Sequence, residues 1–143
     1  MLRSRALWAT AALLLCLVAV DAADFGGKNV VKLTRKNMKE VTADGRLWFI
    51  KFYAPWCGHC KRLAPTWKEL GDEYEGSKQV AIAHIDCTAE KAICKAADVK
   101  GYPTLKLYYE GKIYKPYKGG RDKASLKQFL DGSAADMMTE TVS

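Results

Sequence analysis

Two cysteines, separated by two residues, stand between a strongly apolar segment and an amphipathic one. Cys57 and Cys60 follow the apolar run 47–53 and begin a stretch, 61–74, whose apolar residues recur at helical spacing. At a helix N-terminus, free backbone N–H groups and the helix dipole lower the pKa of a thiol, and a protonated His59 adds to this. The pattern predicts a redox-active pair in which Cys57 attacks a disulfide and Cys60 releases it.

Length and composition bound the architecture. A chain of 143 residues, 49% hydrophobic and 27% charged, can build one domain with a real core and is too short for two. Two arginines precede an apolar run at 6–20, and small residues at 20 and 22 form a cleavage site, so we predict a secretory signal peptide at 1–22. The run of 15 residues is short for a membrane anchor. We expect the folded domain at 23–131 and a flexible tail at 132–143.

Removal of the predicted signal peptide changes the cysteine count and the charge. Cys16 leaves with it, and the remaining four cysteines are an even number, as is usual in an oxidising compartment. The formal charge of +7 falls to about +6, because two arginines and one aspartate are lost. This basic balance indicates a solvated lysine-rich surface or, alternatively, affinity for acidic clients. The aromatic and basic segment 114–118 is interpreted as an edge strand and not as a nucleic-acid-binding face.

The rest of the chain alternates between strand-like and helix-like patterns, which predicts an α/β fold with helices covering both faces of a sheet. Predicted strands lie at 29–33, 47–53, 80–86, 104–109 and 112–114, and predicted helices at 35–42, 61–74, 90–97 and 123–130. Thr34 is the predicted N-cap of the first helix, and Pro65 a predicted kink in the second.

Two separated motifs resemble the protein disulfide isomerase family. The segment 52–61 reads FYAPWCGHCK, and the segment 101–105 reads GYPTL. The resemblance covers roughly 32–131 and implies a thioredoxin fold, a central mixed sheet flanked by helices on both faces, with the redox pair at the N-terminus of the helix that begins near Cys57.

The resemblance also implies roles for individual residues. Cys57, within the motif that includes Gly58, is the nucleophile, more exposed than Cys60 and with the lower pKa. Cys60 is the buried resolving thiol, and His59 favours the Cys57 thiolate. Pro103 is similar to a family proline with a cis peptide bond that faces the pair, which leaves the Tyr102 backbone free to pair with an extended client.

Two further positions are compared with the family pattern. Arg121 matches an arginine that swings toward the resolving thiol, with a solvated loop arginine as the alternative. Many family members place a proton-relaying acid six positions before the nucleophile, where this chain has Lys51. We expect Lys51 to extend its ammonium to water and keep its charge, so the relay role does not carry over to this chain.

Cys87 and Cys94 resemble a second cysteine pair of the family and are interpreted as a structural disulfide. The alternative is a zinc site built from Cys57, Cys60, Cys87 and Cys94 or from His59 and His84. We expect no cofactor and no metal.

The sequence therefore predicts a thiol–disulfide oxidoreductase or protein disulfide isomerase acting on client proteins, with glutathione or an oxidase as possible redox partners and with no nucleic-acid or membrane partner after signal cleavage. The alternative is a redox-controlled client-binding module with little turnover. Because the segment 139–143 is not a Lys-Asp-Glu-Leu-type retrieval signal, we expect the protein in the endoplasmic reticulum lumen or secreted.

Overall fold

Strand β2 (Leu47–Tyr53) lies at the centre of a five-stranded mixed sheet, and all seven of its residues are buried. The computed structural model describes residues 25–142, so the predicted signal peptide at 1–22 lies outside the described residues. The other strands are β1 (Val31–Lys32), β3 (Val80–Asp86), β4 (Thr104–Tyr109) and β5 (Lys112–Tyr117). In the order β1-β3-β2-β4-β5, the first three strands are parallel and the last two are antiparallel to their neighbours.

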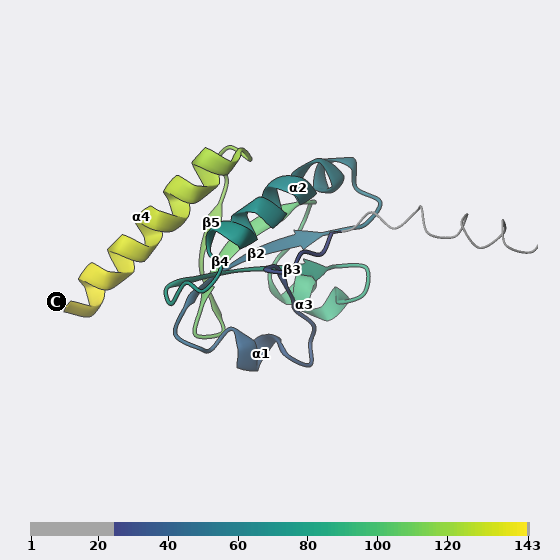
Figure 1. Ribbon diagram of the computed structural model, residues 1–143. Coiled ribbons are helices and arrows are strands. Elements are labelled where there is room, and N and C mark those ends of the chain that lie inside the picture. The colour runs from purple at the N-terminus through teal and green to yellow at the C-terminus, as the bar shows by residue number, and fades with distance from the viewer. Residues whose placement is uncertain (1–24, 143) are drawn as a thin grey trace, which may run out of the picture.

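Four helices cover the two faces of the sheet (Figure 1). Helices α2 (Gly58–Glu73) and α4 (Lys123–Val142) lie on one face, and α1 (Met38–Val41) and α3 (Lys91–Ala96) lie on the other. Alternate residues of β2 supply the two cores: Phe49 packs with Trp67 of α2, whereas Ile50 packs on the α1 and α3 side. This arrangement confirms the predicted thioredoxin fold with helices on both faces.

Three predicted strands coincide with observed ones, and several other boundaries differ. β2, β3 and β4 have the predicted ends, whereas β1 is reduced to two residues and β5 extends through Pro116 on the sheet edge. The first helix is a single turn that begins at Met38, so Thr34 is not its N-cap. Thr34 instead begins a turn, in which its N–H donates to the Asn37 side chain at 2.7 Å.

The C-terminal segment differs from the expected irregular tail. α4 continues to Val142 and therefore includes residues that were assigned to a flexible tail at 132–143. The extension has a packed side, because Ser133 and Ala134 are buried and the Gln79 side chain lies 3.0 Å from Met138 Sδ. No amphipathic stripe marks this segment in the sequence, because the far side of the helix faces solvent and mixes small, acidic and apolar residues.

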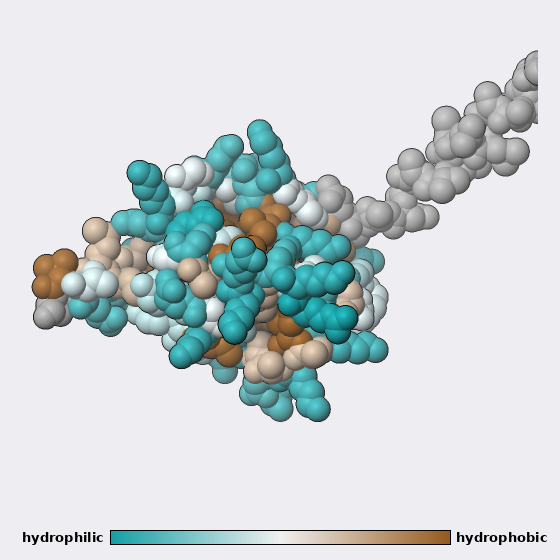
Figure 2. Space-filling view, turned by 90° about the horizontal axis from the view of Figure 1, so that it is seen from below, coloured by the Kyte–Doolittle hydropathy of each residue, from teal (hydrophilic) through white to brown (hydrophobic). Residues whose placement is uncertain are grey.

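Polar side chains cover most of the face formed by α1 and α3, and the apolar patches on it are small and separate (Figure 2). This distribution fits the interpretation of the basic composition as a solvated surface. Within 25–142, no helix has the length and apolar character needed to cross a bilayer.

A disulfide joins the end of β3 to α3. Cys87 and Cys94 are bonded, with their Cα atoms 5.7 Å apart, and both side chains are buried in the core on the α1 and α3 side. The bridge closes a short loop that carries the chain from the sheet into the helix. It therefore stabilises the fold mainly by restricting the unfolded chain.

Helix α2 approaches the N-terminal segment closely at one glycine. A Cβ atom built on Gly71 would lie 2.7 Å from the backbone oxygen of Asn29, which cannot move without displacing the chain before β1. Gly132 in α4 differs, because a Cβ atom there would meet no atom within 4 Å.

We predict opposite effects of alanine at these two glycines. Gly71→Ala should lower the free energy of unfolding by about 1–2 kcal/mol, because the overlap outweighs the gain in helix propensity. Gly132→Ala should raise it by about 0.5–1 kcal/mol, because only the propensity changes. Urea denaturation measures both, and an equal gain in the two variants would show that Gly71 makes no close contact.

For the disulfide, we predict that replacing Cys87 and Cys94 together by alanine lowers the free energy of unfolding by about 1–3 kcal/mol. The redox potential of the Cys57–Cys60 pair should change little, because the bridge lies in a different core. Chemical denaturation and glutathione titration measure the two quantities. Free thiols at both positions in unreduced protein, seen by mass spectrometry, would contradict the bridge.

Candidate active site: a thiol pair at the start of helix α2

Cys57 is the N-cap of α2, with φ −77° and ψ 121°. Its sulfur accepts a hydrogen bond from the Cys60 backbone N–H at 3.4 Å and faces the Tyr102 carbonyl oxygen, 3.5 Å away. Extended backbone before the helix therefore turns the side chain toward the free N–H groups of the first turn. The thiol is 7% exposed, so it borders the surface.

These contacts lower the pKa of Cys57 below its ordinary value. Burial acts in the opposite direction and raises the pKa. Hydrogen bonds from the Cys60 side chain and from the backbone N–H groups of Cys60 and His59, together with the positive charge of Arg121, outweigh burial. The site thus stabilises the nucleophilic thiolate form.

Cys60 lies one turn along α2 and is fully buried. Burial raises the pKa of Cys60 to about 11, and the hydrogen bond and charge of Cys57 add to the rise. A backbone hydrogen bond at Ala54 and the charge of Lys51 oppose it. The two free thiols therefore have unequal acidity, with the more acidic one nearer the surface.

The other two residues of the motif have different surroundings. The guanidinium of Arg62 approaches His59 Nδ1 to 2.7 Å, and because arginine can only donate, this ring nitrogen is the acceptor. The backbone N–H of His59 is one of the groups that lower the pKa of Cys57. Gly58 is the first residue of α2 and is exposed.

The Tyr102–Pro103 peptide bond is cis, and Pro103 is buried next to the pair. The Tyr102 carbonyl oxygen faces Cys57, and the exposed Trp56 ring packs edge-on against the Tyr102 ring at 5.7 Å. Arg121 is exposed in the loop between β5 and α4, and its charge acts on Cys57. The loop thus places this cation beside the nucleophile.

Lys51 does not reach solvent, which corrects the expectation of an extended, charged side chain. Its side chain is fully buried in β2, and its Nζ has no hydrogen-bond partner among residues 25–142. Three rings surround the Nζ, with centroids 5.3–5.7 Å away: Phe25, Tyr53 and Trp67. The sequence did not reveal this surrounding, because the three rings come from three separate segments.

The pKa of Lys51 is lowered to about 8, with burial as the main cause and the charge of Lys68 as a smaller one. A negative charge on Cys60 acts in the opposite direction and raises it. The lysine and the resolving thiol therefore act on each other electrostatically. A cation here favours the Cys60 thiolate, whereas an acid at the same position would disfavour it.

The alternative of a zinc site built from all four cysteines conflicts with the state of two of them. Cys87 and Cys94 are bonded to each other, so they offer no thiolates to a site shared with the active pair. Within the described part of the chain, no group of three or more His, Cys, Asp or Glu residues could hold a metal.

Comparisons with known proteins agree with this geometry. The family model described as Thioredoxin matches residues 29–132. The chain is 39% identical to "Protein disulfide isomerase-like 5-1" of Oryza sativa subsp. japonica over 92% of this chain and 88% of that protein. It is 44% identical to "Thioredoxin domain-containing protein 5 homolog" of Drosophila melanogaster over 71% of this chain, but spans only 24% of that relative.

A solved structure gives the same result. The J-Trx1 fragment of ERdj5 matches with a TM-score of 0.68 and 32% sequence identity, over 75% of this chain and 52% of that one. The rice relative is covered over most of its length, and the solved structure shares the fold. The chain belongs to the thioredoxin family, and its chemistry is that of a thiol–disulfide oxidoreductase of the protein disulfide isomerase type.

Proposed function

We propose that this protein exchanges disulfides with client proteins in the secretory pathway, with Cys57 as the nucleophile and Cys60 as the resolving thiol. The observation that carries the proposal is the unequal acidity of the pair: the pKa of Cys57 is lowered, whereas that of buried Cys60 is raised to about 11. An acidic outer thiol attacks first, and a protonated inner thiol is held in reserve.

In the first step, the Cys57 thiolate attacks one sulfur of a client disulfide. A bond forms between Cys57 and that sulfur, the client disulfide breaks, and the departing client thiolate takes a proton from water. In the second step, Cys60 loses its proton and attacks Cys57. The Cys57–Cys60 disulfide forms, the second client thiolate leaves, and the client has gained two electrons that the pair has lost.

The same steps in reverse donate a disulfide to a client. Isomerisation occurs when a client thiol, and not Cys60, attacks the intermediate and regenerates free Cys57. Because the site stabilises the Cys57 thiolate, it stabilises the reduced pair and makes the disulfide form more oxidising. The exposed Trp56 and the Tyr102 backbone beside Cys57 suit contact with an extended client.

An oxidising lumen is the proposed location. The Cys87–Cys94 bridge supports it, since structural disulfides persist in such compartments, and so does the pattern at 1–22, which is typical of a signal peptide. Glutathione or a protein oxidase is the proposed partner that resets the pair.

We predict different failures for the two cysteines. Cys57→Ser should lower reduction of a disulfide-bonded test protein by at least about two orders of magnitude, because the attacking sulfur is gone. Cys60→Ala should accumulate mixed disulfides on Cys57, visible on non-reducing gels. The Cys87 and Cys94 double alanine variant serves as the control that loses thiols elsewhere.

Retention of half or more of the activity in Cys57→Ser would contradict the assigned nucleophile. Wild-type protein that binds clients but shows no turnover with excess reductant would favour the alternative, a redox-controlled binding module.

For Lys51, we predict that Lys51→Met raises the free energy of unfolding by about 1–3 kcal/mol at neutral pH, because methionine fits the apolar cage without a charge. Folding lowers the pKa of Lys51 from 10.5 to about 8, so the folded protein bears the cost of the buried charge below pH 8. The free energy of unfolding of the wild type rises between about pH 8 and pH 10.5, because the folded state has lost the proton and the unfolded state still holds it. The difference in stability between the wild type and Lys51→Met therefore shrinks across this range and disappears at its upper end. Denaturation at several pH values tests this.

The same variant should resolve mixed disulfides more slowly at neutral pH. The ammonium favours the Cys60 thiolate, and each unit by which the Cys60 pKa rises without it removes about 90% of that thiolate. Above pH 8, where Lys51 loses its charge, the two rates should converge. Lys61→Met, at an exposed lysine next to Cys60 in sequence, is the matched control. Equal rates at every pH in single-turnover release would show that the charge of Lys51 does not act on resolution.

A further inference from the structure

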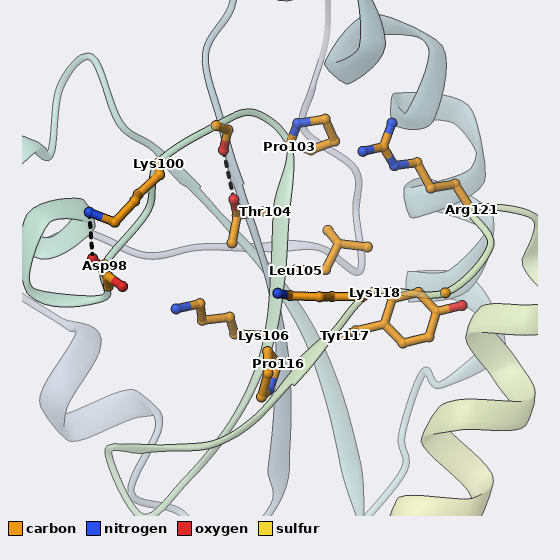
Figure 3. A pocket seen from close by; sticks show the side chains of 12 residues that line it. Asp98, Lys100, Pro103, Thr104, Leu105, Lys106, Pro116, Tyr117, Lys118 and Arg121 are labelled. Atoms are coloured by element: carbon orange, nitrogen blue, oxygen red, sulfur yellow. Dashed lines mark hydrogen bonds and ion pairs between the residues drawn. The ribbon is translucent and has the colours of Figure 1, made fainter.

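A cavity of about 570 Å³ opens beside the redox pair, and its lining is strongly basic. It lies between the loop before β4, the outer strands β4 and β5, and the loop that leads into α4 (Figure 3). Four cationic side chains and one carboxylate line it: Lys100, Lys106, Lys118, Arg121 and Asp98. The cavity therefore carries a formal excess of three positive charges, from four cations minus one anion.

Among residues 25–142, one of these four cations has a carboxylate partner. Lys100 pairs with Asp98 at 3.3 Å, and both side chains are largely exposed. Lys106 donates a hydrogen bond to the Ala97 carbonyl, which carries no counter-charge. Lys118 and Arg121 have no ion pair with any carboxylate of residues 25–142. Three cations thus face the cavity without a counter-charge, a condition that favours an anionic ligand.

One wall of the cavity adjoins the segment that faces Cys57. Pro103 lines it, and the adjacent Tyr102 carbonyl oxygen lies 3.5 Å from Cys57 Sγ. Figure 3 shows the Arg121 guanidinium directed toward Pro103 and the Lys118 side chain lying over the two strands. A client attached to Cys57 therefore places the residues next to its own cysteine at the mouth of the cavity.

The dimensions suit side chains of an extended polypeptide. Successive residues of an extended chain advance about 3.3 Å, so those within about four positions of the client cysteine reach the cavity. Its floor adds the apolar surfaces of Pro103, Leu105 and Pro116, which can contact the client backbone and side-chain stems. A carboxylate entering this cavity meets a fork of donors on Arg121 and mobile ammonium groups on the lysines.

We propose that this basic cavity binds the acidic side chains that flank the cysteine under attack, so that the protein prefers client disulfides with Asp or Glu nearby. This proposal rests on the proposed exchange function and adds a substrate class to it. The cavity acts on the encounter and on the mixed disulfide, and of its four cations Arg121 also acts on the Cys57 thiolate.

The experiment compares short peptides that carry one cysteine as a mixed disulfide with a chromogenic thiol. Glu, Gln or Lys occupies the two positions on each side of the cysteine. The second-order rate constant for single-turnover release by the reduced full chain is measured at low and high salt. The pocket variant is Lys106→Gln with Lys118→Gln, which leaves Arg121 and both thiols in place. Lys118→Gln alone is the milder variant, should the loss of half-buried Lys106 impair folding.

The matched control is Lys78→Gln with Lys112→Gln. Both lysines are exposed and lie at the opposite end of the strands, next to the start of β3 and at the start of β5, so the net charge changes equally. Comparing peptides on the same variant cancels any change in the reactivity of Cys57.

In the wild type, the Glu peptide should react roughly three- to tenfold faster than the Gln peptide, and the Lys peptide more slowly than either. The preference should shrink by half or more in the pocket variant, stay unchanged in the control, and weaken with salt. Equal rates for the Glu and Gln peptides, or an equal loss of preference in both variants, would overturn the proposal. A neutral peptide that fails to react with the wild type would overturn the exchange function itself, and the pocket proposal with it.

Discussion

The central strand β2 determines where the chemistry can occur. It pairs with β3 on one edge and β4 on the other, and both of its faces are covered, so its position in the fold is fixed on four sides. At its C-terminal end the chain turns directly into α2, which places Cys57 at the helix N-terminus. Because β4 is the antiparallel neighbour of β2, its start at Thr104 lies at the same end, and the Tyr102 carbonyl arrives beside the thiol.

The same strand carries a buried lysine that costs the core stability. Lys51 occupies a position that an apolar residue would fill at no electrostatic cost, and its ammonium gains only contacts with ring faces. The buried cation acts electrostatically on Cys60 and offsets part of the desolvation that raises the pKa of that thiol. The burial of Lys51 therefore has two effects: it lowers the stability of the fold, and it makes Cys60 more acidic. Such a conflict between stability and function is common at functional sites.

The sequence predicted the features that depend on residues close together in the chain. β2, β3 and β4 are apolar runs bounded by turn residues, and the active pair lies within four consecutive residues, so both follow from the sequence. The burial of Lys51 depends on Phe25 and Trp67, which are far apart in the chain, and no periodicity relates them. The extension of α4 was not predicted because its local pattern is weak: Ser133 and Ala134 are buried, but they do not form a marked apolar stripe.

Two kinds of positive charge act near the thiol pair, one buried and the other exposed to solvent. They respond differently to ionic strength. Lys51 acts through protein interior, where mobile ions do not enter, so its influence on Cys60 persists at high salt. Arg121 and Lys118 are exposed, and at physiological ionic strength charges more than about 8 Å apart across solvent are largely screened. Ionic strength therefore weakens the attraction of an incoming anionic client while leaving the resolving step nearly unchanged. If salt slows only the binding of an anionic client, then the exposed cations Arg121 and Lys118 act in substrate choice. The buried Lys51 then acts in the release of the client by Cys60.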